Sequence, residues 1–293
     1  MADAPWKTWV AGLPVLSGGL QATDLVAVIR SGVSYQTTGD KILPSVPTDQ
    51  PVPTADNAFY HRNDFGLQTA SLTATTITGD TVFQMSGTGT AVSFADQLLK
   101  NSVNATGVAY CQSGTTTTGR AFIKSTATFR IIDMPSGNED SFLTRLLVSD
   151  TALSNGTDRY AVLAGIMPSP GAYSATQVGI YFVYSDDINS GKWQAVICDG
   201  TNTTTADTGV TAQITSFSKF KITVDKRTSG GNGIRFYIDG VLVATIAATV
   251  TAFSYFTSTT GLYLAGTVGI FKRAGTNVLS TGVDYIQTIH YRA

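Results

Sequence analysis

Residues 217–248, FSKFKITVDKRTSGGNGIRFYIDGVLVATIAA, decide the fold that we predict for this chain. Apolar and polar side chains alternate on both sides of the turn-forming run at 229–233, and a period of two indicates half-buried β-strands. Asp239-Gly240 then separates two apolar runs, which predicts a tight hairpin because such turns need residues that tolerate positive φ. We therefore predict three antiparallel strands, whose buried face requires a second sheet to cover it.

Short runs of the same character recur along the rest of the chain, each bounded by Gly, Asn or Pro. They cover residues 121–132, 142–148, 160–166, 178–184, 193–198, 261–265 and 283–289. Many short strands at this spacing predict an all-β protein, with an antiparallel β-sandwich of the jelly-roll type over residues 111–293. Residues 58–110 show a weaker pattern, and we expect short strands there, around one short helix at 94–100. This region is either a β-rich stem or part of the main domain.

The composition excludes several classes of function. Charged residues make up 13% of the chain, the net charge is −1 and no run of Lys or Arg occurs, so electrostatic capture of nucleic acid has no visible source. No apolar run approaches the length of a membrane span, and the N-terminus lacks a signal-peptide pattern. We expect no membrane insertion. The two cysteines, Cys111 and Cys198, are far apart in sequence, so we expect two buried thiols and no disulfide framework.

The first 43 residues do not have the pattern of a globular core. They predict one small hairpin, with a Ser-Gly turn at 31–32, preceding a proline-rich linker over residues 44–57. An isolated hairpin is marginally stable in water, so we expect this N-terminal arm to bind a partner, either its own copies or another protein. The apolar side chains expected to make that contact are Trp6, Trp9, Leu13, Leu16, Leu25, Val28 and Ile29.

Two resemblances add to this pattern. The arm, with Leu-Pro at 13–14, Thr-Asp-Leu-Val-Ala-Val at 23–28, Gly-Val-Ser-Tyr at 32–35 and Gly-Asp-Lys-Ile at 39–42, resembles the N-terminal attachment segment of bacteriophage tail-fibre and related virion appendage proteins. Residues 110–293 resemble the concanavalin-like, or laminin-G-like, jelly roll. The matching segments are residues 191–195, 199–200, 207–210, 236–244 and 283–286.

Few residues of this chain are suited to catalysis. Relatives of this fold that cleave β-glucans use two carboxyl groups about 5 Å apart, and this chain has one Glu, Glu139, which we expect to be a solvated loop acid. His290 is expected on a polar face of the last strand, without a nucleophile motif to serve. Asp186, Asp187 and Asn189 offer oxygen ligands at short spacing, so either a Ca²⁺ site or an Asx-rich turn fits them. We expect no cofactor and no enzyme activity.

Together the resemblances imply a structural protein of a phage virion, made in the cytoplasm of the host bacterium. The first hypothesis is a homotrimeric short tail fibre, whose arm binds the tail adaptor or portal region and whose sandwich touches host-surface polysaccharide through Trp193 or Tyr255. The alternative is a head fibre or a capsid decoration protein that contacts the major capsid protein. An enzyme acting on glycans is the third and least favoured hypothesis.

Overall fold

The computed structural model describes most of the chain from residue 108 onward. Backbone and side chains are described for residues 86–88, 108–125, 128–134, 138–149, 152–168, 170, 173–226 and 233–291, and the backbone alone for 25–30, 33–38, 58–63, 76–77, 83–85 and 93–97. The chain divides into two compact units, Met1–Pro53 and Thr54–Ala293. In the described ranges, no helix has both the length and the apolar character needed to span a bilayer.

The first unit contains the predicted hairpin. Strand β1 (Leu25–Arg30) pairs antiparallel with β2 (Val33–Thr38), and Arg30 lies opposite Val33, so two residues connect the strands. The side chains of the arm, including all seven apolar positions named above, lie outside the described residues. Their predicted contact with a partner therefore stays a prediction.

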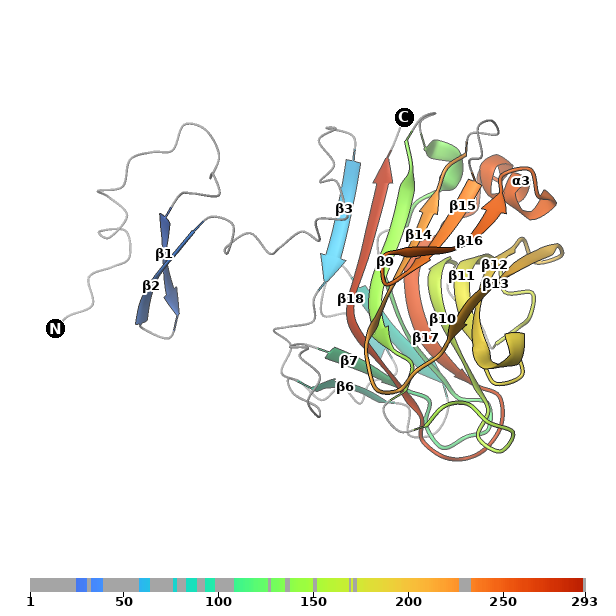
Figure 1. Ribbon diagram of the computed structural model, residues 1–293, viewed down its shortest axis with the longest axis horizontal. Coiled ribbons are helices and arrows are strands. Elements are labelled where there is room, and N and C mark those ends of the chain that lie inside the picture. The colour runs from blue at the N-terminus through green and yellow to red at the C-terminus, as the bar shows by residue number, and fades with distance from the viewer. Residues whose placement is uncertain are drawn as a thin grey trace. The chain divides into compact units, whose positions relative to one another are not determined.

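The second unit is a sandwich of two antiparallel sheets (Figure 1). The first sheet has the order β13 (Thr203–Thr211), β12 (Lys192–Cys198), β11 (Gly179–Tyr184), β10 (Tyr160–Met167), β17 (Ala265–Lys272), β8 (Arg120–Ser125), β5 (Phe83–Thr88) and β4 (Thr76–Ile77). The second has the order β16 (Val241–Ala247), β15 (Gly233–Ile238), β14 (Ser218–Val224), β9 (Asp140–Leu147), β18 (Ser280–Tyr291), β7 (Val108–Gln112) and β6 (Ser93–Gln97), with β3 (Ala58–Asn63) also paired to β18. This architecture confirms the predicted all-β sandwich.

The predicted meander is present as β14, β15 and β16, hydrogen-bonded in sequence order. Asp239 and Gly240 form its second turn with φ of 50° and 82°, the positive values that this dipeptide tolerates. The Asp239 carboxylate also accepts a hydrogen bond of 2.8 Å from the backbone N–H of Lys219. This contact holds the turn against the start of β14.

Three local predictions were wrong. Residues 94–97 belong to strand β6 rather than to a helix, because Phe94 pairs opposite Cys111 in the second sheet and tertiary pairing outweighs local propensity. The predicted strand over 261–265 is confined to Leu264, bridged to Phe129, and to the first residue of β17. The predicted strand over 121–132 ends at Ser125, and a 3-10 turn, η1 (Ile131–Asp133), follows.

One helix, α3 (Thr251–Ser258), was not predicted. Its buried side chains are Ala252, Phe253 and Phe256, which lie on one face at helical spacing and join the core between the sheets. Eight residues are too few for a helical pattern to stand out from the neighbouring apolar strands, so periodicity did not indicate this helix.

The core between the sheets is rich in aromatic side chains. The Trp193 ring lies 4.5 Å from the ring of Phe220, and Phe182 makes edge contacts of 5.1 Å with both Phe220 and Phe236. Trp193 is only 2% exposed, so the predicted glycan contact through this residue is wrong. Its position on β12 alternates with that of outward-facing Gln194, and the indole points inward.

The two cysteines are free and buried, as predicted. Cys111 belongs to the core between the sheets, and burial raises the pKa of its thiol far above the ordinary value. Cys198 lies on the opposite face of the first sheet.

We expect Trp193→Ala to lower the free energy of unfolding by about 3–5 kcal/mol, because the substitution opens a cavity within a packed aromatic cluster. Denaturant unfolding followed by circular dichroism measures this difference. Val241→Ala, at a residue 64% exposed, is the control and should change stability by less than about 0.5 kcal/mol. Equal effects of both substitutions would contradict the assigned position of Trp193.

The sandwich has two distinct ends. We call the first the linker end: β3 begins there with Ala58 opposite Tyr291, the last residue of β18, so the chain arrives there from residues 1–57. Asp140 at the start of β9 lies at the same end, and Phe129 stacks on the ring of His290 with 4.9 Å between ring centroids. Helix α3 follows the end of β16 at this end as well (Figure 1).

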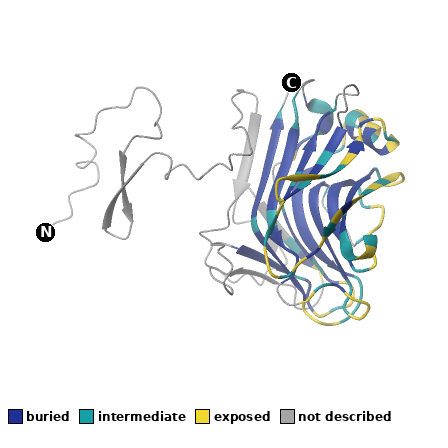
Figure 2. Cartoon of the chain, viewed as in Figure 1, coloured by how far each residue is buried: buried dark blue, intermediate teal, exposed yellow. Residues whose placement is uncertain are grey.

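The opposite end carries the β9–β10, β11–β12 and β17–β18 connections. Tyr160, the first residue of β10, pairs there with Lys272, the last residue of β17. Leu147 at the end of β9 pairs with Gly282 near the start of β18. Figure 2 shows that the central strands are mostly buried, while exposed residues lie in the connections and on the edge strands β13 and β16.

Candidate functional site

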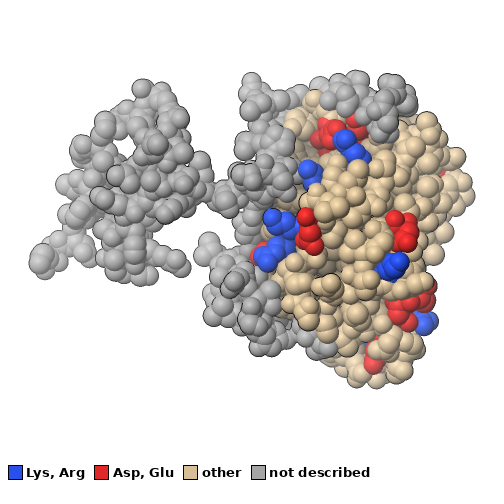
Figure 3. All heavy atoms as spheres, viewed as in Figure 1, with Lys and Arg blue, Asp and Glu red and all other residues tan. Residues whose placement is uncertain are grey.

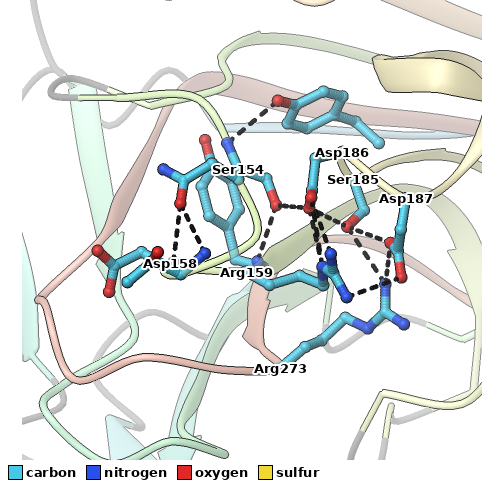
Figure 4. A network of polar contacts seen from close by, with 11 residues as sticks. Ser154, Asp158, Arg159, Ser185, Asp186, Asp187 and Arg273 are labelled. Carbon is cyan, nitrogen blue, oxygen red and sulfur yellow. Dashed lines mark hydrogen bonds and ion pairs between the residues drawn. The ribbon is translucent and has the colours of Figure 1, made fainter.

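The sequence-predicted cation loop lies at the opposite end of the sandwich. Asp186 and Asp187 follow the end of β11 after one residue, Arg159 directly precedes β10, and Arg273 directly follows β17. Because these three strands are neighbours in one sheet, their side chains converge (Figure 4). We call these four residues the Arg–Asp cluster.

Each acid of the Arg–Asp cluster has an arginine partner. The Arg159 Nε donates to Asp186 Oδ1 at 3.1 Å, and Arg159 Nη2 donates to Asp186 Oδ2 at 3.1 Å. Arg159 Nη1 also lies 3.6 Å from Asp187 Oδ2. Arg273 Nη1 forms an ion pair with Asp187 Oδ1 and donates to Ser185 Oγ at 3.2 Å. Two-point contact of this kind matches the planar guanidinium fork to the carboxylate.

Ser154 connects the cluster to the β9–β10 connection. Its hydroxyl donates to Asp186 Oδ1 at 2.5 Å and accepts from the backbone N–H of Tyr160 at 3.0 Å. The backbone N–H of Ser154 donates to the Tyr184 hydroxyl at 3.1 Å, and burial raises the pKa of that phenol to about 12. The loop is thus fastened to two strands of the first sheet.

The cluster holds both acids ionised. Partial burial acts to raise the pKa of Asp186, but the hydrogen bonds from Arg159 and Ser154 and the charge of Arg159 outweigh it, and the pKa lies below its ordinary value. Burial likewise opposes ionisation of Asp187, and Arg273 and Ser185 reverse that effect, so its pKa is also lowered. Neither acid is suited to donate a proton near neutral pH.

The three residues predicted as Ca²⁺ ligands do not form one site. The Asn189 amide donates instead to the Trp193 carbonyl at 2.8 Å and to Asp207 Oδ1 at 2.6 Å. A cation at Asp186 and Asp187 would have to displace Arg159 and Arg273. Over the described residues, no group of three or more His, Cys, Asp and Glu side chains is placed to hold a metal.

We expect millimolar Ca²⁺ to change the thermal unfolding midpoint by less than about 1 °C relative to EDTA, because a ligand stabilises a protein only in proportion to its occupancy. Differential scanning fluorimetry measures this shift. A rise of several degrees that disappears in the Asp186→Asn, Asp187→Asn double variant would show that the ion displaces the arginines.

The lowered pKa values predict a pH dependence of stability. A carboxyl whose pKa is lower in the folded than in the unfolded chain stabilises the fold above its unfolded pKa, about 3.9, and loses this contribution as the pH falls through the folded pKa. The double variant should therefore be less stable than the natural chain at pH 7. The difference should shrink from about pH 4 downward. Urea unfolding at pH 7, 5, 4 and 3 tests this, and a constant difference would contradict it.

The outer face of the first sheet is also apolar. On β10, β11, β12 and β17, alternate residues face the core between the sheets, and the residues between them form a second buried cluster. This outer cluster comprises Ala161, Leu163, Met167, Tyr181, Val183, Val196, Cys198 and Phe271. Strands β10, β11, β12 and β17 are therefore apolar on both faces, and none of the four contains an Asp or Glu.

The β10–β11 connection lies over this outer face. The connection leaves β10 at Met167 and enters β11 at Gly179, and both residues lie at the linker end. Between them, Tyr173 packs against the outer cluster, as does Ile188. The Tyr173 ring lies 4.6 Å from the guanidinium of Arg273, at the opposite end. Arg273 thus joins the connection to the Arg–Asp cluster through a cation–π contact.

A buried pair at the linker end contradicts the prediction for His290. This side chain is 4% exposed and does not lie on a polar face; its Nδ1 is 2.7 Å from Asp140 Oδ2, and Asp140 is 1% exposed. Asp140 Oδ1 accepts from the backbone N–H of Tyr291 at 3.0 Å. Burial raises the pKa of Asp140 despite His290. Glu139, expected to be solvated, forms an ion pair with Arg235.

Tyr263, at the linker end, is an exposed aromatic residue that was not predicted from the sequence as a possible contact residue. Tyr263 is 55% exposed, and Arg130 lies 5.6 Å from its ring and also pairs with Asp133 at 2.7 Å. The predicted contact residue Tyr255 is half-buried on α3, edge-on to Phe256, and its contact with glycan stays a prediction. Gly261, exposed two residues before Tyr263, was the available signal of a loop in place of a strand.

The arrangement of two antiparallel sheets around one core defines this unit as a concanavalin-like jelly-roll β-sandwich. Comparison of structures supports the class. The endo-1,3-beta-glucanase from Streptomyces sioyaensis is similar with a TM-score of 0.53 and 15% identity, over 83% of this chain and 100% of the glucanase. A protein of unknown function from Shewanella oneidensis MR-1 is similar with a TM-score of 0.53 and 15% identity, over 83% of this chain and 91% of that protein.

A weaker similarity, with a TM-score of 0.44 and 10% identity, links 68% of this chain to 88% of the carbohydrate recognition domain of Emp46p. No protein-family profile matches the chain, and no curated protein matches it. At these identities the comparisons show a shared fold, and fold alone does not decide activity.

Proposed function

We propose that this chain is a structural protein of a bacteriophage virion, with its N-terminal unit as the attachment arm and its sandwich as an exposed binding head. The observation that carries the proposal is the separation of a hairpin unit, Met1–Pro53, from a sandwich unit with its own core. The attachment-segment resemblance of residues 1–43 supports it. Because a two-stranded hairpin is marginal alone, the arm gains stability by association, and we propose a homotrimer.

The acids of the sandwich favour a binding role over a catalytic one. A retaining glycosidase needs one protonated and one ionised carboxyl group about 5 Å apart around an accessible bond. Asp186 and Asp187 are neighbours, but arginines lower the pKa of both. Asp140 has a raised pKa, yet it is 1% exposed and paired with His290. The similarity to the glucanase concerns the fold alone. On the outer face of β10, β11, β12 and β17, the clustered side chains are apolar and no acid is present.

Within the virion we favour a short tail fibre whose sandwich contacts glycan on the host surface. Charged residues make up only 13% of the chain. A surface with so few charges suits a hydroxyl-rich ligand more than an ionic one. A head fibre or capsid decoration protein of similar build is the alternative. Copy number separates them, because a few trimers per particle fit a tail fibre and hundreds of chains fit decoration.

We expect a chain that begins at Thr54 to keep a folded sandwich but to be absent from virions. The described core lies entirely within Thr54–Ala293, whereas the arm would supply the docking contacts, at about 1.5–3 kcal/mol per large buried side chain before ordering costs. Thermal unfolding of the purified truncated chain and its quantity in particles made with that chain alone test both parts.

The full-length chain in the same particles is the control. Normal incorporation of the truncated chain would overturn the arm as the attachment element and would favour a decoration protein bound through its sandwich. Failure of the truncated chain to fold would instead show that the arm belongs to the core.

A further inference from the structure

The topology gives the sandwich a direction. The chain arrives from the arm at the linker end, where Ala58 of β3 lies opposite Tyr291 of β18. Helix α3, Tyr263 and the buried Asp140–His290 pair lie at this same end. Tyr255 and Tyr263 therefore lie at the end of the sandwich where β3, its first strand, begins.

The outer cluster on β10, β11, β12 and β17 is shielded from solvent. Its residues are buried, and Tyr173 of the β10–β11 connection packs against them while Arg273 holds the Tyr173 ring at 4.6 Å. Pro168 and Pro170 restrict φ at two positions of this connection. A ligand that bound the outer cluster would have to displace the Tyr173 side chain, which packs against the cluster and makes a cation–π contact with Arg273.

The opposite end, by contrast, presents ordered polar groups to solvent. Asn277 Nδ2 donates to Asp158 Oδ2 at 2.6 Å, which joins the β17–β18 connection to the β9–β10 connection. Asn155 Oδ1 accepts from the backbone N–H groups of Thr157 and Asp158 at 2.9 and 3.0 Å. Asn155, Thr157 and Asn277 are exposed, so the hydrogen-bonded amides of Asn155 and Asn277 and the hydroxyl of Thr157 are accessible to solvent.

Backbone geometry keeps the two connections together. Gly275 has a φ of 80°, and a Cβ atom there would lie 2.1 Å from Asp158 Oδ1 and 2.7 Å from the Thr157 carbonyl oxygen. Only glycine fits this close approach. Two further contacts hold the connections to the strand ends. One is the Arg–Asp cluster, and the other is Lys272, whose Nζ donates to the Gly114 carbonyl at 3.0 Å.

The charge of this end is balanced locally. Arg159 pairs with Asp186 and Arg273 with Asp187, so the cluster offers no net charge to a polyanion. On the face shown in Figure 3, the charged side chains of the described residues lie in small groups of both signs, separated by broad uncharged surface. Beside Asn277, Val278 is 43% exposed and adds an apolar contact.

From this we infer that the surface formed by Asn155, Thr157, Asp158, Asn277 and Val278 at the opposite end of the sandwich is a glycan-binding surface for uncharged, hydroxyl-rich polysaccharide. This inference rests on the proposed function. Planar amide and carboxyl groups that are already fixed lose little freedom when they bind sugar hydroxyls, and the exposed valine packs against sugar C–H groups.

The experiment compares two double variants of the full-length chain. Asp158→Ala with Asn277→Ala removes the bridging pair of the proposed surface and leaves the Arg–Asp cluster unchanged. Asp133→Ala with Tyr263→Ala is the matched control, since it removes an acid and an exposed partner at the linker end. Both variants should keep the unfolding midpoint of the natural chain within a few degrees, about the range of surface substitutions.

The readouts are adsorption of fluorescently labelled chain to host cells and competition by the host's purified surface polysaccharide. We expect the polysaccharide to compete with the natural chain, the first variant to lose at least about tenfold in adsorption, which corresponds to 1.4 kcal/mol, and the control to retain it. Unchanged adsorption of the first variant, equal loss in both, or no adsorption of the natural chain would overturn the inference. So would adsorption that polysaccharide does not reduce, because that result indicates a protein receptor.

Incorporation into virions distinguishes this inference from the proposed function. Both double variants carry an intact arm and should enter particles like the natural chain. If they are incorporated and the first variant still adsorbs normally, the glycan surface is wrong and the virion role stands. If the natural chain itself is absent from particles, the proposed function fails.

Discussion

Four neighbouring strands that are apolar on both faces govern this structure, because each face must be kept from water by something else in the chain. The second sheet covers the inner faces of β10, β11, β12 and β17, and Tyr173 and Ile188 from two connections pack against the outer cluster. The same strands must approach closely, and a Cβ atom at Gly165 would lie 2.2 Å from the Ile180 carbonyl oxygen. Surface that would otherwise be available for a ligand on this sheet is used for packing.

The Arg–Asp cluster solves the electrostatic problem at one end of that sheet. Three connections meet there, and several carboxylates close together would repel one another without a cation. Arg159 and Arg273 provide positive charge that is covalently part of the chain, with the donor geometry that carboxylates accept. The cluster is about one-third exposed or less, so its value lies in orienting the connections more than in net stabilisation.

The strands could be predicted from the sequence because alternation and turn residues are local signals, and the meander ending in Asp239-Gly240 is the clearest case. The roles of individual side chains were harder to predict. Trp193 was expected outside because a strand with two apolar faces gives no sequence sign of which face is exposed. His290 was misplaced because its partner, Asp140, lies 150 residues earlier. The same holds for Asp187 and Arg273, which are 86 residues apart and meet only through strand order.

The position of the last strand has a consequence for biosynthesis. Strand β18 lies inside its sheet, between β9 and β7, and it also pairs with β3, the first strand of the sandwich. Residues up to Tyr291 must therefore leave the ribosome before β3, β7 and β9 acquire their shared neighbour. Until then these strands have open edges that can pair with other chains. A protein synthesised in this order completes its second sheet in a single late step, and premature termination even a few residues before Tyr291 leaves Asp140 without the partner that allows its burial.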